Sequence, residues 1–271
     1  MLLGGFDGLH LGHRQLLARA KESGLPVGVM TIVGAKGQKS LFSFAEREQI
    51  FKESGADFVF ELPFGEIKDL SADEFIRLLQ TEFNPKLFVC GEDFRFGAGA
   101  QGDAQTLKGI DTVRVEVLSL VEIGGEKVSS GTVKKYLEIG DVETANALLD
   151  EKFFLLGEVV QDRQVGRTLG FPTANVLYPS EKFSLKKGVY ETKICLERDT
   201  YRGITNYGAR PTFDDDVVLT ETYLDGFEGD LYGKTLKIEF VRYLRDIQKF
   251  DCVDKLKKQL TQDIGRVRNH D

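Results

Sequence analysis

The stretch Gly5–His13 reads GFDGLHLGH and holds two of the three histidines of a 271-residue chain. It follows a short apolar start, Leu2-Leu3, and precedes residues 14–23, whose apolar spacing predicts a helix. A glycine-rich turn between a strand and a helix exposes N–H groups and the positive end of the helix dipole, and both bind phosphate. The pattern predicts a phosphate site in which His10 and His13 stabilise charge during phosphoryl or nucleotidyl transfer. The alternative is a turn whose histidines only cap and pack.

Composition limits the classes of protein to which the chain can belong. It is 41% hydrophobic and 29% charged, and no apolar run approaches the ~20 residues of a membrane span, so no membrane partner is expected. No signal segment is visible, and Cys90, Cys195 and Cys252 are few and scattered. That usage indicates a reducing, cytoplasmic location and favours neither disulfides nor zinc. A net charge of −7 argues against nucleic-acid binding.

The first half of the chain alternates between strand and helix patterns. Apolar runs at residues 27–33, 58–62, 87–90 and 113–118 are typical of buried parallel strands. Two helices between them have the capping-box spacing, Ser43 with Glu46 and Ser71 with Glu74. The alternation predicts a doubly wound, Rossmann-like α/β domain that binds ligands at the carboxyl ends of its strands. Helices near residues 132–138 and 142–149 would close this domain, at residues 1–150.

The second half, residues 151–271, changes in character. Strand-like runs at 153–160, 188–196, 201–206, 218–224 and 235–243 are separated by turn signals and predict a small antiparallel barrel or sandwich. A final amphipathic helix, residues 252–267, places Val253, Leu256, Leu260 and Ile264 on one face. His270, the third histidine, is expected to fray because it is the penultimate residue.

A second motif lies at residues 166–175, GRTLGFPTAN. Thr173 and Asn175 offer neutral oxygens on one side of an extended segment. Such oxygens can complete the shell of a Mg²⁺ ion whose other ligands are water and nucleotide phosphates. A solvated turn is the alternative interpretation.

These motifs and others in the same order resemble those of the bacterial bifunctional riboflavin kinase/FMN adenylyltransferase (FAD synthetase) family. The resemblance implies a nucleotidyltransferase α/β domain followed by a six-stranded β-barrel kinase domain. It implies phosphorylation of riboflavin to FMN and adenylylation of FMN to FAD, with ATP as co-substrate and Mg²⁺ as cofactor. The other matching stretches are GEDFRFG (91–97), VSSGTVKKYL (128–137), KKGVYET (186–192), GITNYGARPTF (203–213), ETYLDGFEGDLYG (221–233) and YLRDIQKF (243–250).

In the first domain the resemblance implies that His10 and His13 contact ATP phosphates while the FMN phosphate attacks the α-phosphate. Asp7 would orient the turn. The implied ATP- and phosphate-binding set further comprises Gly5, Gly8, Gly12, Ser129, Ser130 and Lys134, and the implied flavin contacts are Asp93 and Phe94.

In the kinase domain the resemblance implies that Thr173 and Asn175 hold Mg²⁺ and the ATP phosphates. Glu221 would take the proton from the riboflavin 5′-hydroxyl. Gly166 and Arg167 would join the ATP site, and Asn206, Arg210 and Arg245 would lie at the flavin.

The first domain also departs from the family pattern. Residues 32–39 replace a Pro-His-Pro-like segment, and Lys134 stands where the family has Arg, whose fork Lys cannot reproduce. These departures favour an alternative, a riboflavin kinase with a degenerate, non-catalytic or regulatory first domain, whereas the intact histidines favour the bifunctional enzyme. A flavin-responsive regulator without turnover is a third hypothesis, which the presence of Glu221 disfavours. The expected partners are small molecules only, with a monomer or weak homo-oligomer.

Overall fold

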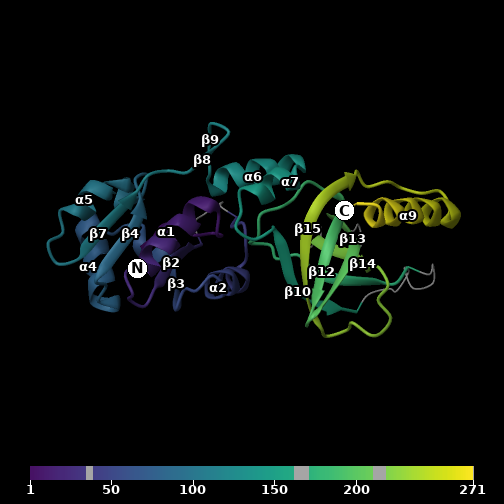
Figure 1. The fold of residues 1–271 in the computed structure, drawn as a ribbon, viewed down its shortest axis with the longest axis horizontal. Helices are drawn as coiled ribbons and strands as arrows, with labels where there is room; N and C mark the ends of the chain where they lie inside the picture. The colour runs from purple at the N-terminus through teal and green to yellow at the C-terminus, as the bar shows by residue number, and fades with distance from the viewer. Residues whose placement is uncertain (35–38, 162–170, 210–217, 271) are drawn as a thin grey trace. The chain divides into compact units, whose positions relative to one another are not determined.

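The computed structural model describes residues 1–34, 39–161, 171–209 and 218–270. The chain divides into two compact units, Met1–Thr132 and Val133–Asp271, and each is described by itself (Figure 1). Among the described residues, none of the helices combines the length and apolar character needed to cross a membrane.

The first unit is built on a parallel five-stranded sheet in the order β3-β2-β1-β4-β7. This confirms the expected doubly wound, Rossmann-like fold. Because β2 and β4 lie on opposite sides of β1, the chain reverses its direction of winding at β1, which is where such sheets bind ligands. The strands are β1 (Leu2–Leu3), β2 (Gly28–Val33), β3 (Phe58–Pro63), β4 (Leu87–Gly91) and β7 (Arg114–Leu118).

Helices flank this sheet, and two of them begin at the predicted capping boxes, Ser43 and Ser71. One apolar cluster joins Phe75 and Leu79 of α4 to Leu3, Met30 and Phe88 of three neighbouring strands. The helices are α1 (Leu11–Lys21), α2 (Phe44–Glu53), α3 (Phe64–Ile67), α4 (Ala72–Phe83) and α5 (Ala104–Lys108). Short elements complete the unit: β5 (Arg95–Phe96), η1 (Ala98–Ala100), β6 (Gly102–Asp103), β8 (Glu122–Ile123) and β9 (Glu126–Lys127).

The second unit is a closed barrel in the order β10-β11-β14-β13-β12-β15, so the barrel is confirmed and the sandwich excluded. The five strand-like runs are all strands, and the sixth strand, β11, is the extended segment that carries Thr173 and Asn175. The strands are β10 (Phe154–Val160), β11 (Thr173–Leu177), β12 (Gly188–Leu196), β13 (Asp199–Ala209), β14 (Val218–Leu224) and β15 (Thr235–Arg245). Helices α6 (Ser130–Ile139), which begins in the first unit, and α7 (Val142–Ala147) precede the barrel, and α9 (Val253–Arg268) follows it.

Side chains alternate between the two faces of the barrel strands. On β14, Thr220 and Thr222 are fully buried, whereas Glu221 between them is half-buried on the other face. Inside, the hydroxyl groups of Thr192, Thr205 and Thr222 form a chain with oxygen–oxygen distances of 2.9 Å. The inner and outer faces of β14 therefore carry different chemistry.

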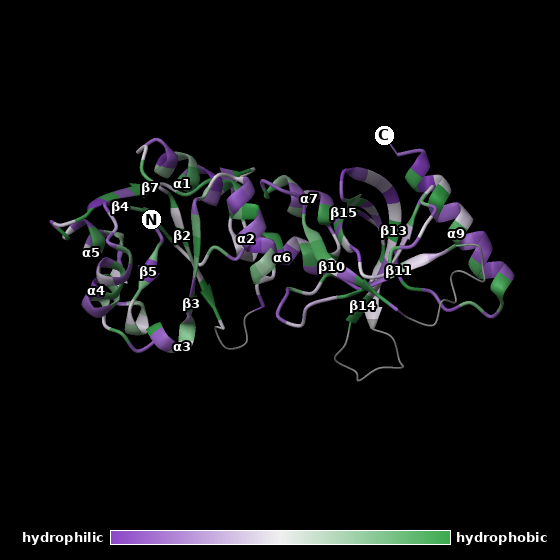
Figure 2. Ribbon diagram, turned by 90° about the horizontal axis from the view of Figure 1, so that it is seen from below, coloured by the Kyte–Doolittle hydropathy of each residue, from purple (hydrophilic) through white to green (hydrophobic). Residues whose placement is uncertain are grey.

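Helix α9 packs on the barrel through its carboxyl half. Ile264 and Val267 are buried against Val189 and Ile204, but Val253 at the start of the helix is 51% exposed. The predicted apolar face is therefore used only in part, and hydrophilic residues dominate the rest of the helix (Figure 2). His270 does not fray as expected, because its Nδ1 lies 2.9 Å from a carboxylate oxygen of the buried Glu191.

Candidate functional sites

A cavity of about 290 Å³ opens at the carboxyl ends of β1, β4 and β7, at the winding reversal of the parallel sheet. Both histidines of the glycine-rich turn line it. Its other described lining residues come from the glycine-rich turn, from the loop after β4, and from β9 and the residues that follow it. They include Gly5, Gly12, Asp93, Phe94, Lys127 and Ser129. The sequence-predicted phosphate and flavin residues of this domain are thus largely brought together around one cavity.

The turn is held in an unusual backbone conformation. Phe6 adopts φ +41°, in the left-handed region that residues other than glycine rarely enter, and its ring is buried. That ring packs against the His13 imidazole with centroids 4.2 Å apart, and against Phe51 of α2. His10 is the N-cap of α1, and its Nδ1 accepts a hydrogen bond from the His13 backbone N–H at 3.2 Å.

Hydrogen bonds assign the tautomers of the two imidazoles. Because His10 Nδ1 accepts a bond, the ring proton of the neutral form lies on Nε2, where it can be donated to an anion. His13 Nδ1 lies 2.7 Å from the Gly8 carbonyl oxygen, which can only accept, so His13 carries its proton on Nδ1. The pair therefore offers one donor and one acceptor when both rings are neutral.

Burial favours the neutral form of both imidazoles. Their rings stack with centroids 3.6 Å apart. Burial lowers the pKa of His10 to about 2, with the neighbouring His13 acting in the same direction. Burial also lowers the pKa of His13, although the bond to Gly8 and the Asp7 carboxylate oppose that shift. An arriving triphosphate would raise both pKa values because it supplies negative charge.

The glycines of the turn have different roles. Gly5 is exposed at the cavity, and a Cβ atom there would meet no atom within 4 Å. Gly12 lies against the His10 ring, where a Cβ atom would come within 3.1 Å of Nδ1. Gly8 is buried and positions His13 through its carbonyl oxygen. Bulk at Gly12 would therefore displace His10, whereas Gly5 leaves room for a ligand.

Polar contacts tie this turn to the start of α6. Asp7 accepts a hydrogen bond from the Ser130 hydroxyl, so that Ser130 buttresses the turn. Ser129 lines the cavity and accepts the Thr132 backbone N–H at 3.2 Å. The Lys127 ammonium pairs with the Asp93 carboxylate at the same cavity, and Phe94 stacks on Phe96. Lys127 is thus a cation at the cavity that the motifs did not indicate.

Lys134 has a different environment. It lies in the second unit, and its ammonium is 5.9 Å from the centre of the Phe183 ring. Its assignment as a phosphate ligand stays a prediction.

The barrel carries a polar row that crosses three strands. Asn175 on β11 pairs with Glu221 on β14, and Glu221 pairs in turn with Asn206 on β13. The Asn206 Nδ2 donates to Glu221 Oε2 at 3.4 Å. Directly paired residues share one face of a sheet, so these side chains lie next to one another although they are far apart in sequence. Thr173, two residues before Asn175, is exposed on the same strand face.

Two amide oxygens in this row are buried. Neither Asn175 Oδ1 nor Asn206 Oδ1 has a hydrogen-bond partner among the described residues. Burying an acceptor without a partner costs about 1–3 kcal/mol, so these oxygens mark a place where a ligand or cation would be stabilised.

Arg245 extends the row to β15, since both Arg245 and Asn206 pair with Val189 of β12. Its guanidinium donates from Nε and Nη2 to Asp263 of α9, at 2.9 and 2.8 Å. Asp263 is fully buried. The proposed flavin residue is therefore anchored by the carboxyl-terminal helix. The predicted residues Gly166, Arg167 and Arg210 lie outside the described residues.

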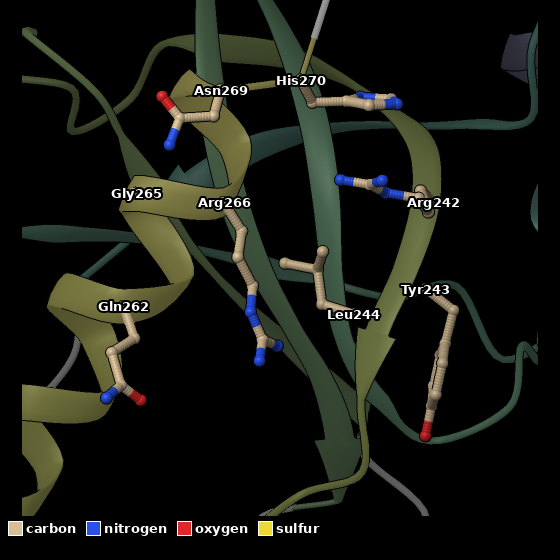
Figure 3. Close-up of a pocket in the computed structure, with 8 residues that line it drawn as sticks. All are labelled: Arg242, Tyr243, Leu244, Gln262, Gly265, Arg266, Asn269 and His270. Carbon is tan, nitrogen blue, oxygen red and sulfur yellow. The ribbon is translucent and has the colours of Figure 1, made fainter.

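A second, larger cavity of about 820 Å³ lies between β15 and α9 (Figure 3). Figure 3 shows the Arg242 guanidinium close to the His270 imidazole, with Arg266 reaching from α9 beside Leu244. Glu191 joins the first two, because it accepts a bond from Arg242 at 2.8 Å and contacts His270. None of the described residues that line this cavity was proposed as a site residue, although Tyr243 and Leu244 lie in the YLRDIQKF stretch.

Two further buried residues contact the glycine-rich turn, directly or through each other, and the sequence motifs did not indicate them. Thr31 on β2 and Arg47 on α2 are both buried and hydrogen-bonded to each other. Thr31 is the only hydroxyl residue in the apolar run of residues 27–33, and a lone polar residue in a buried strand is a signal that sequence reasoning can use.

Both halves of the chain are similar in sequence to known proteins. A family model described as FAD synthetase matches residues 1–132, and one described as riboflavin kinase matches residues 149–270. Curated relatives described as bifunctional riboflavin kinase/FMN adenylyltransferase are 33% identical over 284 residues in Escherichia coli and 32% identical over 285 residues in Bacillus subtilis. Each alignment covers 97% of this chain, and 90% and 89% of the respective relative.

A solved structure has the same fold over the whole chain. It is a Streptococcus pneumoniae protein whose structure is titled a macrolide-efflux protein, and it is 31% identical to this chain. The match covers 100% of this chain and 93% of that one, with a TM-score of 0.87.

Proposed function

The chain belongs to the bifunctional riboflavin kinase/FMN adenylyltransferase family, and from this premise we propose which of its residues carry each activity. The enzyme phosphorylates riboflavin with ATP to give FMN, and it adenylylates FMN with a second ATP to give FAD. No observation on the described residues favours a degenerate first domain. We assign the adenylyltransferase to residues 1–150 and the kinase to residues 151–271. The family matches to residues 1–132 and 149–270 support one activity in each part of the chain, whereas contacts group residues 133–150 with the second unit.

The adenylyltransferase centre is the cavity beside the glycine-rich turn. A phosphate oxygen of FMN attacks the α-phosphorus of ATP, and the bond to the β-phosphate breaks as pyrophosphate leaves. Negative charge grows on the transferring group, and the preorganised Nε2–H of His10 is a donor that can stabilise it. The His13 ring stacks on the His10 ring, so it faces the transferring group from the same side of the turn. Asp93 and Phe94 line the same cavity and are proposed to contact the flavin.

The kinase centre is the polar row on the barrel. Glu221 accepts the proton of the riboflavin 5′-hydroxyl as that oxygen attacks the γ-phosphorus of ATP, and ADP leaves. Asn206 donates to the Glu221 carboxylate and holds it in place. A general base must lie within hydrogen-bond reach of the proton that it removes, and Glu221 is half-buried on an outward face where a substrate can approach.

The chemistry of this row fits Mg²⁺. Asn175 Oδ1, which has no hydrogen-bond partner among the residues that the structure describes, is a buried neutral oxygen of the kind that completes a Mg²⁺ shell alongside water and phosphate oxygens. Thr173 and Asn175 are therefore the proposed Mg²⁺-binding residues, and the ion would neutralise charge on the ATP phosphates.

The single observation that carries the assignment is the side-by-side placement of Asn175, Glu221 and Asn206 on three strands, which gives a base and neutral oxygens in one row. We further propose a cytoplasmic location, which the three free cysteines support, and a monomer or weak homo-oligomer without a nucleic-acid partner.

One incubation tests both activities and the proposed Mg²⁺ dependence. Purified protein is given riboflavin, ATP and Mg²⁺, and FMN and FAD are separated by chromatography, with a parallel reaction in EDTA. We expect both products with Mg²⁺ and no FMN in EDTA. FMN formation in EDTA at the full rate would contradict the proposed metal dependence.

A further inference from the structure

A hydrogen-bonded chain reaches the backbone of the glycine-rich turn from two side chains that lie outside every quoted motif. Arg47 of α2 donates from Nη1 to the hydroxyl oxygen of Thr31 on β2. The Thr31 hydroxyl in turn donates to the backbone carbonyl of Phe6 at 3.2 Å, with the Gly5 carbonyl at 3.4 Å as a weaker second acceptor. Thr31 is fully buried and Arg47 is 3% exposed.

The direction of this chain follows from the donor inventory. A guanidinium can only donate, so Arg47 occupies a lone pair of the Thr31 oxygen. The single hydroxyl proton is then left for the carbonyl of Phe6. Arg47 thereby fixes the rotor of the hydroxyl group, and the cation polarises the bond that this group makes to the turn. The Glu61 carboxylate lies 3.7 Å from Arg47 Nη2 and balances part of the buried charge.

The residue that receives this bond is the strained one. A side chain held in the left-handed region costs of order 1–3 kcal/mol, and such a conformation persists only where the surroundings impose it. Phe6 is held at its carbonyl by Thr31 and at its ring by Phe51. Arg47 and Phe51 are four residues apart on α2, so one helix face supplies both restraints.

From Phe6 the restraint reaches the two histidines. The Phe6 ring packs on His13, and the His13 ring stacks on His10. We propose that Thr31 and Arg47 are positioning residues for adenylyl transfer, which lock the strained turn so that His10 and His13 meet the triphosphate in a fixed orientation. The inference rests on the proposed role of the two histidines.

The test measures FAD formation from FMN and ATP in Thr31→Val, which removes the hydroxyl group and keeps the shape. A misplacement near 1 Å can lower a rate about 100-fold, so we expect kcat to fall roughly tenfold to hundredfold. The KM for ATP should change little, because the lost interaction acts on geometry at the reacting centre. Thr31→Ser retains the hydroxyl group and should restore most of the rate.

The chain supplies its own control. FMN formation from riboflavin uses the other domain, so it should be unchanged in Thr31→Val. Thr220→Val is a matched variant, because Thr220 is also fully buried and its hydroxyl donates to a strand carbonyl, that of Val176, at 2.9 Å. It should leave FAD formation from supplied FMN at the parent rate.

A second pair of variants separates positioning from folding. If Thr31→Val unfolds below the assay temperature, Arg47→Lys replaces it, since Lys keeps the charge and loses the planar fork. A folded Arg47→Lys protein with the parent kcat would overturn the proposal. So would a Thr31→Val protein whose FMN and FAD rates fall in parallel.

His13→Ala, assayed alongside, distinguishes this inference from the site on which it rests. A full rate in His13→Ala would overturn the proposed site and the inference together. A large loss in His13→Ala with a full rate in Thr31→Val overturns the inference alone.

Discussion

The cavity beside β1 and the polar row on the barrel are both proposed to bind ATP phosphates, but their residues come from different distances along the chain. His10 and His13 stand three residues apart in one turn, so local geometry places them together. Asn175, Glu221 and Asn206 come from three strands, and only the strand register makes them neighbours. The first site therefore depends on turn conformation, whereas the second depends on the closure of the barrel.

The kinase base should show the largest effect. Glu221→Gln keeps the size of the side chain and removes its proton acceptor, and general-base catalysis contributes typically 10²–10⁴-fold. We expect FMN formation to fall by about that factor, while the barrel stays folded by circular dichroism and FAD formation from supplied FMN continues. Near-normal FMN turnover would show that Glu221 is not the base.

Replacing the histidines of the turn should give the second-largest loss of activity. The preorganised Nε2–H of His10 is a donor of the kind worth about 10²–10³ in rate, so His10→Ala should lower FAD formation by that factor. His13→Ala should lower it by a similar factor, because the charge of an arriving triphosphate favours a protonated His13 that donates from Nε2. FMN formation should continue at the parent rate. If parent and both variants make FAD equally well, the histidines only cap and pack, and the local turn is a structural device.

Acidic pH should lower the free energy of unfolding of the first domain through His10. Burial lowers the pKa of His10 to about 2, whereas an imidazole in the unfolded chain titrates near 6.5. The unfolded chain then binds more protons below pH 6.5, so stability falls as the pH decreases through that window. From pH 7 to pH 5 this group alone should cost about 2 kcal/mol.

His10→Gln removes that titration and should flatten the pH dependence of urea unfolding, followed by circular dichroism. Equal losses of stability in parent and variant between pH 7 and pH 5 would mean that the His10 imidazole remains able to protonate in the folded protein.

The metal-binding residues should show the smallest effect. Thr173→Ala and Asn175→Ala each remove one neutral oxygen, and we expect riboflavin phosphorylation at limiting Mg²⁺ to fall about tenfold. The Mg²⁺ concentration for half-maximal rate should rise, and adding Mg²⁺ should recover part of the loss. FAD formation from supplied FMN serves as the control, and an equal loss there would show that the two sites are not independent.

Sequence patterns predicted most of the fold, because apolar periodicity and capping boxes are local. Ser43 and Ser71 begin helices as their spacing requires, and the parallel strands and the barrel strands lie close to the expected ranges. The buried face of the carboxyl-terminal helix was predicted less accurately. Its periodicity includes Val253, which stays exposed because only the last turns reach the barrel.

The candidate sites were predicted to different extents for the same reason. The turn histidines were evident from a nine-residue motif, but Lys127, Thr31 and Arg47 reach the first site through tertiary contacts that have no fixed sequence spacing. Likewise, nothing local in the sequence indicates that Arg245 pairs with Asp263, eighteen residues later. Such pairs become visible only when the barrel is closed and the helix is placed on it.

The attachment of α9 has a practical consequence for handling the protein. Arg268 pairs with Asp225, Arg202 donates to the last helical carbonyls, and His270 contacts Glu191, so the barrel holds the final residues at several points. The same helix anchors Arg245 through Asp263. An affinity tag or fluorescent fusion attached directly after α9 would perturb a helix that positions a proposed flavin contact. A label for kinase measurements therefore belongs elsewhere, for example at a cysteine introduced on the exposed face of α4 in a Cys252→Ser protein, because Cys252 at the start of α9 is itself an exposed free thiol.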